Sequence, residues 1–259
     1  AAHCGSMDEA SRLRDYLQSQ MPAALGMLHE MVGINSFTAN RDGVNALGRF
    51  TAECFETLGF SAEFVPSANP RFGDHLVLTR KGRSERSVAM ISHLDTVYPP
   101  EEEALNDFRW QVDGDRIYGP GTNDIKGGTV LMWLVLTALH HSDPELFSEI
   151  TWKLLWNSSE EETSPDFGDV CLSHFDKRTQ AALVFESEGR SGTDPLVVVA
   201  RKGRATWRAT VTGRGAHAGS LHPRGANAIV QLGRIVDRIA ALTDHARGIT
   251  FNVGTVSGG

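Results

Sequence analysis

The sequence predicts an α/β fold, in which helices flank a sheet of short strands. Stretches of helical periodicity alternate along the chain with short apolar runs, which is the order of elements in α/β sheets. Several apolar runs also stop directly before a histidine or a carboxylate, and such sheets bind ligands beyond the carboxyl ends of their strands. The same strand ends therefore carry the candidate functional residues.

Two helices and three strands are expected first. Met7 to Ile34 has helical periodicity, and Asp42 to Leu58 has the pattern of an amphipathic helix that Gly59 closes. Short strand-like runs follow at 62–65, 75–79 and 88–92.

The middle of the chain adds a helix and two strands. A glycine-rich turn leads into the apolar stretch Val130 to Leu139, which we predict to be helical. Ile150 to Trp156 is strand-like, and Ala181 to Phe185 is an apolar run of the type found in buried strands. At 259 residues the chain can form one large domain or two smaller ones.

A polar stretch from Glu188 to Pro195 marks a change in composition. Beyond it, Ala205 to Thr212 alternates like a strand with one exposed face, Gly225 to Leu242 is helical by pattern, and Ile249 to Val256 is strand-like. We therefore expect a second, smaller β-α-β unit in this part of the chain.

His93 and Asp95 follow the strand predicted at 88–92 and form the first candidate site. Side chains alternate along a strand, so the two residues lie on one face. There the carboxylate can accept the second imidazole N–H and leave the other nitrogen for a metal. A hydrogen-bonded structural histidine is the alternative when the pair is considered alone.

Asp124 lies in the glycine-rich turn 118–128, close before the helix predicted from Val130. Glycines at such a place let the backbone approach a ligand closely. An aspartate cap of the helix N-terminus is the alternative, and it is compatible with ligand binding.

Carboxylates also follow the last two strand-like runs of this region. The triplet Glu160 to Glu162 comes after the run 150–156, and three adjacent carboxylates need water or cations around them. Glu186 follows the apolar run 181–185, where a surface residue at a strand end is the alternative. Acids at several strand ends converge on one place in an α/β sheet.

A cluster of His93, Asp124, Glu161 and Glu186 would be unstable without a divalent cation, because its carboxylates repel one another. Its nitrogen and oxygen donors, without a thiolate, suit zinc, cobalt or manganese. We therefore predict a metal site at the carboxyl ends of the strands.

Together these segments resemble the signature motifs of the co-catalytic zinc carboxypeptidase and aminoacylase family, which includes glutamate carboxypeptidase, acetylornithine deacetylase and succinyl-diaminopimelate desuccinylase. The resemblance extends from His93 to Gly259, and the motifs Thr96-Val97 and Gly119-Pro120-Gly121 look closest to the glutamate carboxypeptidase branch. It implies a zinc-peptidase-type mixed sheet flanked by helices, with the first half of an inserted α+β, ferredoxin-like lid domain that pairs with its twin in a homodimer.

The resemblance also implies a role for each candidate ligand. Asp124 would bridge two zinc ions, with cobalt or manganese as possible substitutes. His93 and Glu186 would complete one site, and Glu161 would belong to the other. Asp95 would orient the imidazole of His93.

Glu160 would be the general base, which takes a proton from a metal-bridging water. Asn157 and Ser164 bracket the family pattern N-x-D-E-E-x-G-S and fix the register of the glutamates. Ser159 and Thr163 depart from that pattern, which has Asp and Gly there, so the geometry of the turn is where this chain is expected to differ.

The same resemblance divides the chain into a catalytic domain over 7–201 and the first part of the lid domain over 202–259. Two lid motifs, at 215–220 and 223–228, match the family. His217 in the first of them would reach the active site of the neighbouring subunit and polarise the substrate carbonyl. A histidine packed in a glycine-rich turn is the alternative.

Family members continue beyond the position of Gly259 with the rest of the lid and a final catalytic segment. That segment carries the last histidine ligand and groups that bind the substrate carboxylate. The chain is therefore expected to be a fragment, a truncated product or one of two chains, with an incomplete metal site. Ala1 to Ser6, before Met7, has the character of a cloning remnant.

Composition argues against several classes of function. The sequence has no basic block of the kind that binds nucleic acid. The apolar stretch 130–139 is too short to cross a bilayer, which needs roughly 20 apolar residues. The proposed metals would neutralise part of the net charge of −7. With Cys4 in the remnant, Cys54 and Cys171 have no spacing typical of a disulfide or a thiolate site, which favours the cytoplasm, with export as the alternative.

Two classes of function stay open. The intact protein is predicted to be a dimeric amide hydrolase that acts on a small peptide or an N-acyl amino acid. It is either a carboxypeptidase that cleaves beside a C-terminal acidic or small residue, or a deacylase. The alternative is a metal-binding piece without catalytic activity, unable to hold both ions.

Overall fold

A computed structural model describes residues 4–162, 164–187, 190–191, 194–200 and 202–258. The backbone divides into two compact units, Ala1–Gly189 and Arg190–Gly259. The domain boundary at 201/202 that the family resemblance implies stays a prediction.

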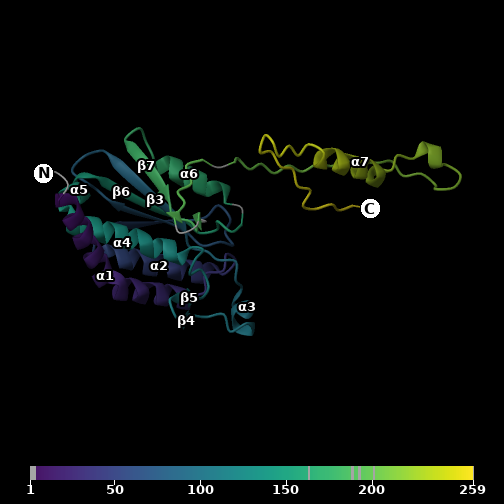
Figure 1. The fold of residues 1–259 in the computed structure, drawn as a ribbon. Coiled ribbons are helices and arrows are strands. Elements are labelled where there is room, and N and C mark those ends of the chain that lie inside the picture. Colours follow the sequence, from purple (N-terminus) through teal and green to yellow (C-terminus); the bar gives the residue numbers. More distant parts are fainter. Residues whose placement is uncertain (1–3, 163, 188–189, 192–193, 201, 259) are drawn as a thin grey trace. The chain divides into compact units, whose positions relative to one another are not determined.

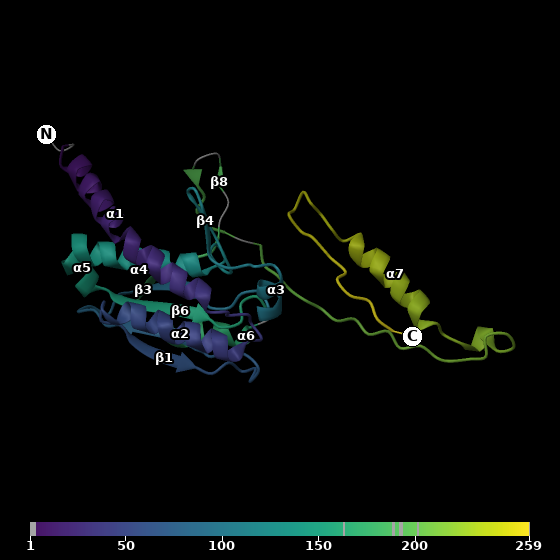
Figure 2. The same ribbon diagram turned by 90° about the horizontal axis from the view of Figure 1, so that it is seen from below.

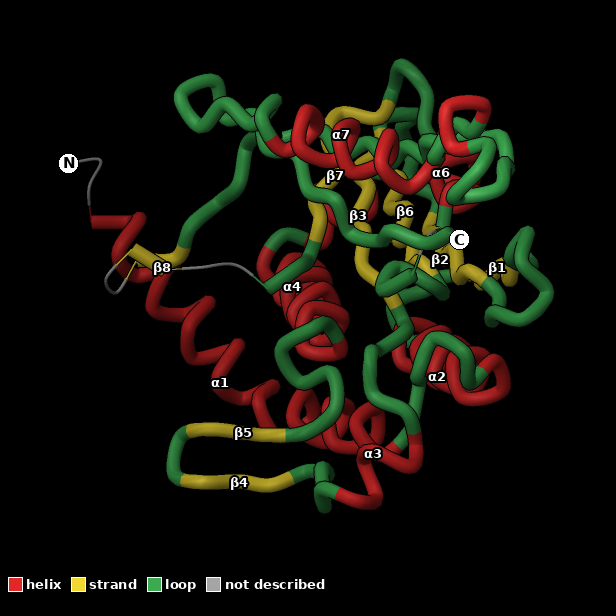
Figure 3. The backbone as a smooth tube through the Cα atoms, turned by 90° about the vertical axis from the view of Figure 1, so that its right-hand side faces the viewer, coloured by secondary structure: helices red, strands yellow, loops and turns green. Residues whose placement is uncertain are grey.

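The first unit is built around a mixed sheet of five strands in the order β1-β2-β6-β3-β7 (Figure 3). These strands are β1 (Ser61–Val65), β2 (His75–Arg80), β3 (Ser87–His93), β6 (Thr151–Asn157) and β7 (Thr179–Val184). β2 is antiparallel to both β1 and β6, whereas β6, β3 and β7 run parallel. The predicted α/β class with a mixed sheet is confirmed.

Helices cover both faces of this sheet (Figures 1 and 2). One face is covered by α1 (Cys4–Gly33), α2 (Arg41–Glu56) and α4 (Lys126–Ser142), and the other by α6 (Pro165–His174). The unit also contains α3 (Pro100–Leu105), α5 (Pro144–Glu149) and the hairpin of β4 (Gln111–Asp113) and β5 (Arg116–Tyr118). The helices predicted over 7–34, 42–58 and 130–139 are confirmed.

The side chains of the central strands alternate between two cores, as the period of a strand requires. Leu76 and Leu78 of β2 join the larger core with α1, α2 and α4, whereas Val77 between them belongs to the core that includes residues of α6. β3 and β6 alternate in the same way. Each fully buried large apolar side chain contributes about 1.5–3 kcal/mol, so the two cores hold the strands in a single register.

β7 is more exposed than the sequence suggested. Its apolar run was expected to be buried, but Leu183 is 47% exposed and Val184 is 62% exposed. The reason is its place in the sheet, because β7 is an edge strand that pairs with β3 on one side. Apolar residues alone do not distinguish an edge strand from a central one.

The parallel strands place their carboxyl ends at one edge of the sheet. His93 at the end of β3 is opposite Asn157 at the end of β6, and Ile91 is opposite Val184 at the end of β7. The antiparallel β2 begins at this same edge, where its second residue pairs with Trp156. Residues that follow β3, β6 and β7 therefore meet there.

The second unit contains two-residue strands β8 (Arg190–Ser191) and β9 (Asp194–Pro195), a 3₁₀ turn at His222–Arg224 and the helix α7 (Ala228–Ala240). Asn227 caps α7, since its side chain accepts the backbone N–H of Val230 at 3.0 Å. The predicted helix is thus confirmed, although it is shorter than the pattern 225–242. Part of the polar stretch 188–195 lies outside the described residues.

The strands predicted at 205–212 and 249–256 are wrong. The ring centroids of Trp207 and Phe251 are 6.4 Å apart, so the two segments lie side by side. A strand also needs a ladder of backbone hydrogen bonds. Over the described part of this unit after residue 201, backbone pairing is limited to the isolated bridges Arg214–Ala226 and Asp244–Ile249. Across the described ranges of the whole chain, no helix is both long and apolar enough to cross a bilayer.

Candidate metal centre

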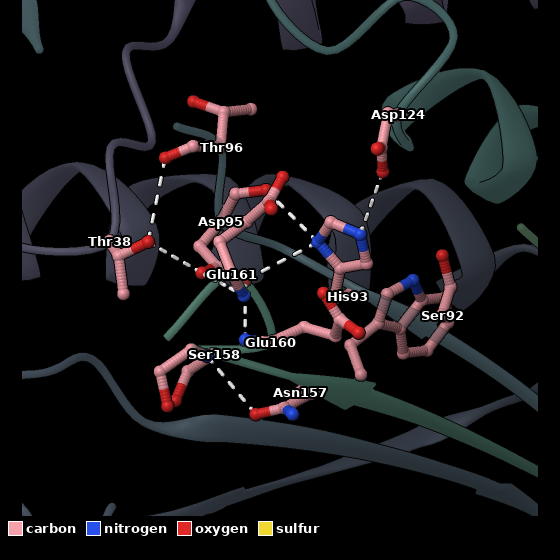
Figure 4. Close-up of polar contacts among 12 residues, drawn as sticks. Thr38, Ser92, His93, Asp95, Thr96, Asp124, Asn157, Ser158, Glu160 and Glu161 are labelled. Atoms are coloured by element: carbon pink, nitrogen blue, oxygen red, sulfur yellow. Dashed lines mark hydrogen bonds and ion pairs between the residues drawn. The ribbon is translucent and has the colours of Figure 1, made fainter. Parts of the chain in front are cut away.

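His93 ends β3 with both ring nitrogens in polar contacts (Figure 4). Its side chain is 1% exposed. Nδ1 lies 3.0 Å from the backbone oxygen of Asp95 and 3.3 Å from the carboxylate Oδ1 of the same residue. Nε2 lies 3.0 Å from Asp124 Oδ1 and 3.5 Å from Glu186 Oε1. The imidazole therefore has Asp95 on one side and two further carboxylates on the other.

His93, Asp124 and Glu186 can hold one divalent cation. One ligand atom from each residue lies within 4.8 Å of the other two. An imidazole nitrogen with two carboxylate oxygens is a donor set that zinc accepts. The residues present at this edge of the sheet therefore fit the predicted metal.

The turn before α4 directs Asp124 towards His93 and not towards the helix terminus. α4 begins at Lys126, and its N-cap residue is Ile125, which makes no side-chain cap bond. The interpretation of Asp124 as an N-cap is therefore wrong. Gly121 in this turn has a φ of 76°, and a Cβ there would lie 3.0 Å from the Lys126 side chain, so the close packing of the turn requires glycine.

The turn that follows β6 contains Glu160, Glu161 and Glu162, and we call it the glutamate turn. Asp95 links His93 to this turn (Figure 4). Its side chain is fully buried. Oδ1 accepts the backbone N–H of Glu160 at 2.9 Å, and Oδ2 accepts that of Glu161 at 3.2 Å. The hydroxyl of Thr38 also donates to Oδ2, at 2.6 Å. One carboxylate thus positions the imidazole and both glutamates.

The three glutamates of the turn differ in exposure. Glu160 and Glu162 are exposed, whereas Glu161 is half-buried. Burial and the neighbouring charge of Asp124 raise the pKa of Glu161 to about 7. The carboxylates crowded at this point repel one another, and a bound cation would relieve that repulsion.

Asn157 closes the glutamate turn. Its side-chain oxygen accepts the backbone N–H of Ser159 at 3.1 Å and the hydroxyl of Ser164 at 2.9 Å. The two residues that bracket the family pattern are therefore in direct contact. Ser159, which stands where that pattern has Asp, is fully buried, and Thr163 lies outside the described residues.

The charges around His93 favour its protonated form. Burial lowers the pKa of His93, but its contacts with Asp124 and Asp95 and the charge of Glu186 outweigh that effect and raise the pKa to about 10. A metal ion binds only the neutral imidazole. Proton and metal therefore compete for Nε2.

This competition predicts that zinc binding releases protons. At pH 7 we expect roughly one proton from His93 when zinc binds there and, because the pKa of Glu161 is about 7, about half a proton more wherever zinc also binds Glu161. Affinity at the His93 site should rise about tenfold per pH unit between pH 7 and 9, since the proton is lost only near pH 10. Calorimetric titration with zinc in two buffers of different ionisation enthalpy measures the release. Zinc binding without proton release at pH 7 would contradict the arrangement.

His217 lies in the second unit, and its contacts are with residues of that unit. Its side chain is exposed, and its Nδ1 accepts the backbone N–H groups of Gly219 at 3.2 Å and Ser220 at 3.1 Å. A backbone N–H can only donate, so the neutral ring carries its proton on Nε2. His217 thus presents an N–H donor to solvent.

Sequence reasoning missed three residues that contact the site. Thr38 bonds to Asp95 across 57 positions, and no motif links the two. His75 at the start of β2 contacts the glutamate turn, and Asp166 in the first turn of α6 contacts His75. The position of His75 at a strand end on the site edge was the one available signal.

Similarity to known proteins extends over both units. A family model described as a peptidase dimerisation domain matches residues 199–259. Carboxypeptidase G2 of Pseudomonas sp. is 32% identical over 233 residues, which are 90% of this chain and 54% of that protein. A succinyl-diaminopimelate desuccinylase of Methylorubrum populi is 27% identical over 236 residues, or 87% of this chain and 58% of that protein. The chain thus spans somewhat over half the length of these curated relatives.

Solved structures agree on the fold. A tripeptidase from Staphylococcus aureus has a TM-score of 0.59 at 21% identity, covering 91% of this chain and 61% of that one. An M20 family metallo-carboxypeptidase from Sulfolobus solfataricus has a TM-score of 0.58 at 17% identity, covering 85% of this chain and 50% of that one. At these identities the likeness supports the fold alone.

Proposed function

The chain belongs to the M20 family of metallopeptidases, whose dimerisation domain matches residues 199–259, and on that premise we propose that it forms the metal centre of a zinc-dependent amide hydrolase of the carboxypeptidase type. One observation carries the proposal. His93, Asp124 and Glu186 converge, and the carboxylate of Asp95 holds the turn of Glu160 and Glu161 beside them.

We assign two zinc ions to this edge of the sheet. His93, Asp124 and Glu186 would hold one ion, and Asp124 with Glu161 would hold the other. When bound, such a pair supplies Lewis acidity that acidifies water and polarises the carbonyl of the scissile amide. The half-buried position of Glu161 and its charge coupling to Asp124 support its assignment as a ligand.

Glu160 is assigned as the general base. Its carboxylate is exposed and so can reach water, while its backbone N–H is fixed on Asp95. Glu160 takes a proton from the attacking water and then delivers it to the nitrogen of the leaving amine. The hydrogen bond from its backbone N–H to Asp95 limits the positions that the Glu160 carboxylate can adopt.

His217 is assigned to the substrate carbonyl of a neighbouring subunit in a homodimer formed through residues 199–259. The dimerisation-domain match and the Nε2–H that the local hydrogen bonds leave available support this role. Donation from Nε2 to the carbonyl oxygen would stabilise the negative charge that develops there.

We expect His217→Ala to lower turnover by about 10²–10³-fold, the usual cost of losing one donor to a developing oxyanion. Zinc content, measured by elemental analysis, should not change, because His217 is not a ligand. His222→Ala is the matched control, since it removes another exposed histidine of the same unit. Equal turnover in the His217→Ala and wild-type chains would rule out the role.

The desuccinylase relative favours deacylation of N-acyl amino acids as a second candidate. Zinc content per chain and hydrolysis of a panel of dipeptides and N-acyl amino acids test both candidates. Two zinc ions with cleavage of C-terminal residues support the carboxypeptidase, and cleavage of N-succinyl substrates supports the deacylase. One ion or none, without turnover, would identify a metal-binding piece that lacks activity.

The cellular location is proposed to be the cytoplasm. Cys54 and Cys171 are both free thiols, as expected of a protein in a reducing compartment. Recovery of the protein from the periplasmic fraction of its source cells would overturn this assignment.

A further inference from the structure

Four successive peptide N–H groups of the glutamate turn donate to side-chain atoms. None of these four bonds is a backbone hydrogen bond of a helix or a strand. The N–H of Ser158 bonds to His75, that of Ser159 to Asn157, and those of the next two residues to Asp95. Asn157 ends β6 directly before the turn, whereas Asp95 follows β3. His75 is therefore a second anchor from outside the turn, and nothing so far gives it a function.

His75 is fully buried at the start of β2 and has polar partners at both ring nitrogens. Nδ1 accepts the backbone N–H of Ser158 at 3.1 Å and lies 3.1 Å from the Ser158 hydroxyl. Nε2 lies 3.1 Å from Asp166 Oδ2. Because a peptide N–H only donates, Nδ1 is the acceptor, and Nε2–H donates to Asp166.

Asp166 holds the ring of His75 in this orientation. The same Oδ2 accepts the backbone N–H of Ala68 at 2.7 Å and the hydroxyl of Ser67 at 3.1 Å. Partial burial raises the pKa of Asp166, but the N–H of Ala68 and the contact with His75 lower it, to about 2. The carboxylate is therefore ionised at neutral pH and is a strong acceptor for Nε2–H.

We propose that His75 is a positioning residue, which fixes the peptide of Ser158 and thereby places the carboxylates of Glu160 and Glu161 for catalysis and metal binding. The proposal rests on the proposed function, which gives those two glutamates their roles. Its physical basis is the short tether, because Ser158 is two residues from Glu160 and each peptide between them is planar. Among the described residues, loss of the anchor at Ser158 leaves Asp95 as the remaining acceptor from outside the turn for the peptide N–H groups of residues 158–161.

Two amide substitutions of His75 each keep the contact of one ring nitrogen and remove the contact of the other. In His75→Asn, the side-chain oxygen takes the place of Nδ1 and still accepts the N–H of Ser158, while the contact with Asp166 is lost. In His75→Gln, the amide nitrogen takes the place of Nε2 and still donates to Asp166, while the acceptor for Ser158 is lost. The proposal therefore predicts different results for two variants that each lose one buried contact.

Amide hydrogen exchange of the metal-free chain gives a readout that does not depend on activity. We expect His75→Gln to speed exchange at Ser158, Glu160 and Glu161 by about tenfold or more, and His75→Asn to remain within about twofold of the wild type. Zinc titration should show about 10–100-fold weaker binding at the Glu161 site in His75→Gln only, with Glu161→Gln as the reference for loss of that site.

Several outcomes would overturn the proposal. One is wild-type exchange at Ser158 in folded His75→Gln. Another is equal acceleration in both variants in proportion to their loss of thermal stability, which would mean that His75 supports the fold alone. If His75→Gln does not fold, Asp166→Ala must accelerate exchange at Ser158, because His75 then loses the acceptor that orients it. A wild-type chain that binds no zinc would contradict the proposed function, whereas the exchange contrast would still decide the role of His75.

Discussion

Glu160→Gln is expected to lower kcat by about 10²–10⁴-fold while the chain keeps its full zinc content. Glutamine has nearly the shape of glutamate, and the backbone N–H that bonds to Asp95 is unchanged by the substitution. The amide cannot take a proton from water, so the proton transfer loses its acceptor. Metal binding should persist because the assigned ligands are His93, Asp124, Glu161 and Glu186.

The same glutamate triplet supplies the control for this experiment. Glu162 is exposed like Glu160 but has no assigned role, so Glu162→Gln removes the same charge from the same turn. We expect Glu162→Gln to retain kcat within about twofold, as is usual for surface substitutions with little energetic effect. Full activity of a zinc-loaded Glu160→Gln preparation would exclude Glu160 as the base and direct attention to Glu161.

The first unit could be predicted largely from sequence because its patterns are local. Helical and strand periodicities reflect which face of an element is buried, and the three central strands, with a core on both faces of the sheet, keep those patterns. The burial of β7 could not be predicted, because exposure of Leu183 depends on which strand occupies the edge of the sheet. The segments at 205–212 and 249–256 show the same limit, since alternation favours a strand but a strand forms only where a partner backbone completes the ladder.

The candidate site divides in the same way. Residues at or just after the ends of strands, such as His93 and Glu186, could be predicted because the topology brings strand ends together. Thr38 and His75 could not, since each acts through long-range hydrogen bonds that leave no spacing pattern. The cap interpretation of Asp124 was wrong because the helix begins one residue later than a cap at this position requires.

Asp95→Asn is expected to weaken zinc binding at both sites at once, by about 10–100-fold each. The carboxylate of Asp95 has two oxygens that accept the N–H groups of Glu160 and Glu161 and the hydroxyl of Thr38. An asparagine has a single acceptor oxygen, so its amide group must face a buried donor. The free energy of unfolding should fall by about 1–3 kcal/mol, the usual cost of a buried donor without an acceptor.

The loss of charge at Asp95 acts on His93 as well. The contact and charge of Asp95 help to raise the pKa of His93, so the neutral side chain should lower that pKa, which makes Nε2 a weaker donor but also reduces the competition from its proton at pH 7. Zinc titrations at pH 7, with denaturant unfolding of the metal-free chain, measure both effects. Thr38→Val is the control, because it removes one hydrogen bond to Oδ2 and leaves the carboxylate in place. If Asp95→Asn lowers the zinc affinity of one site and not of the other, Asp95 does not position both the imidazole and the glutamate turn. The two would then be held independently of each other.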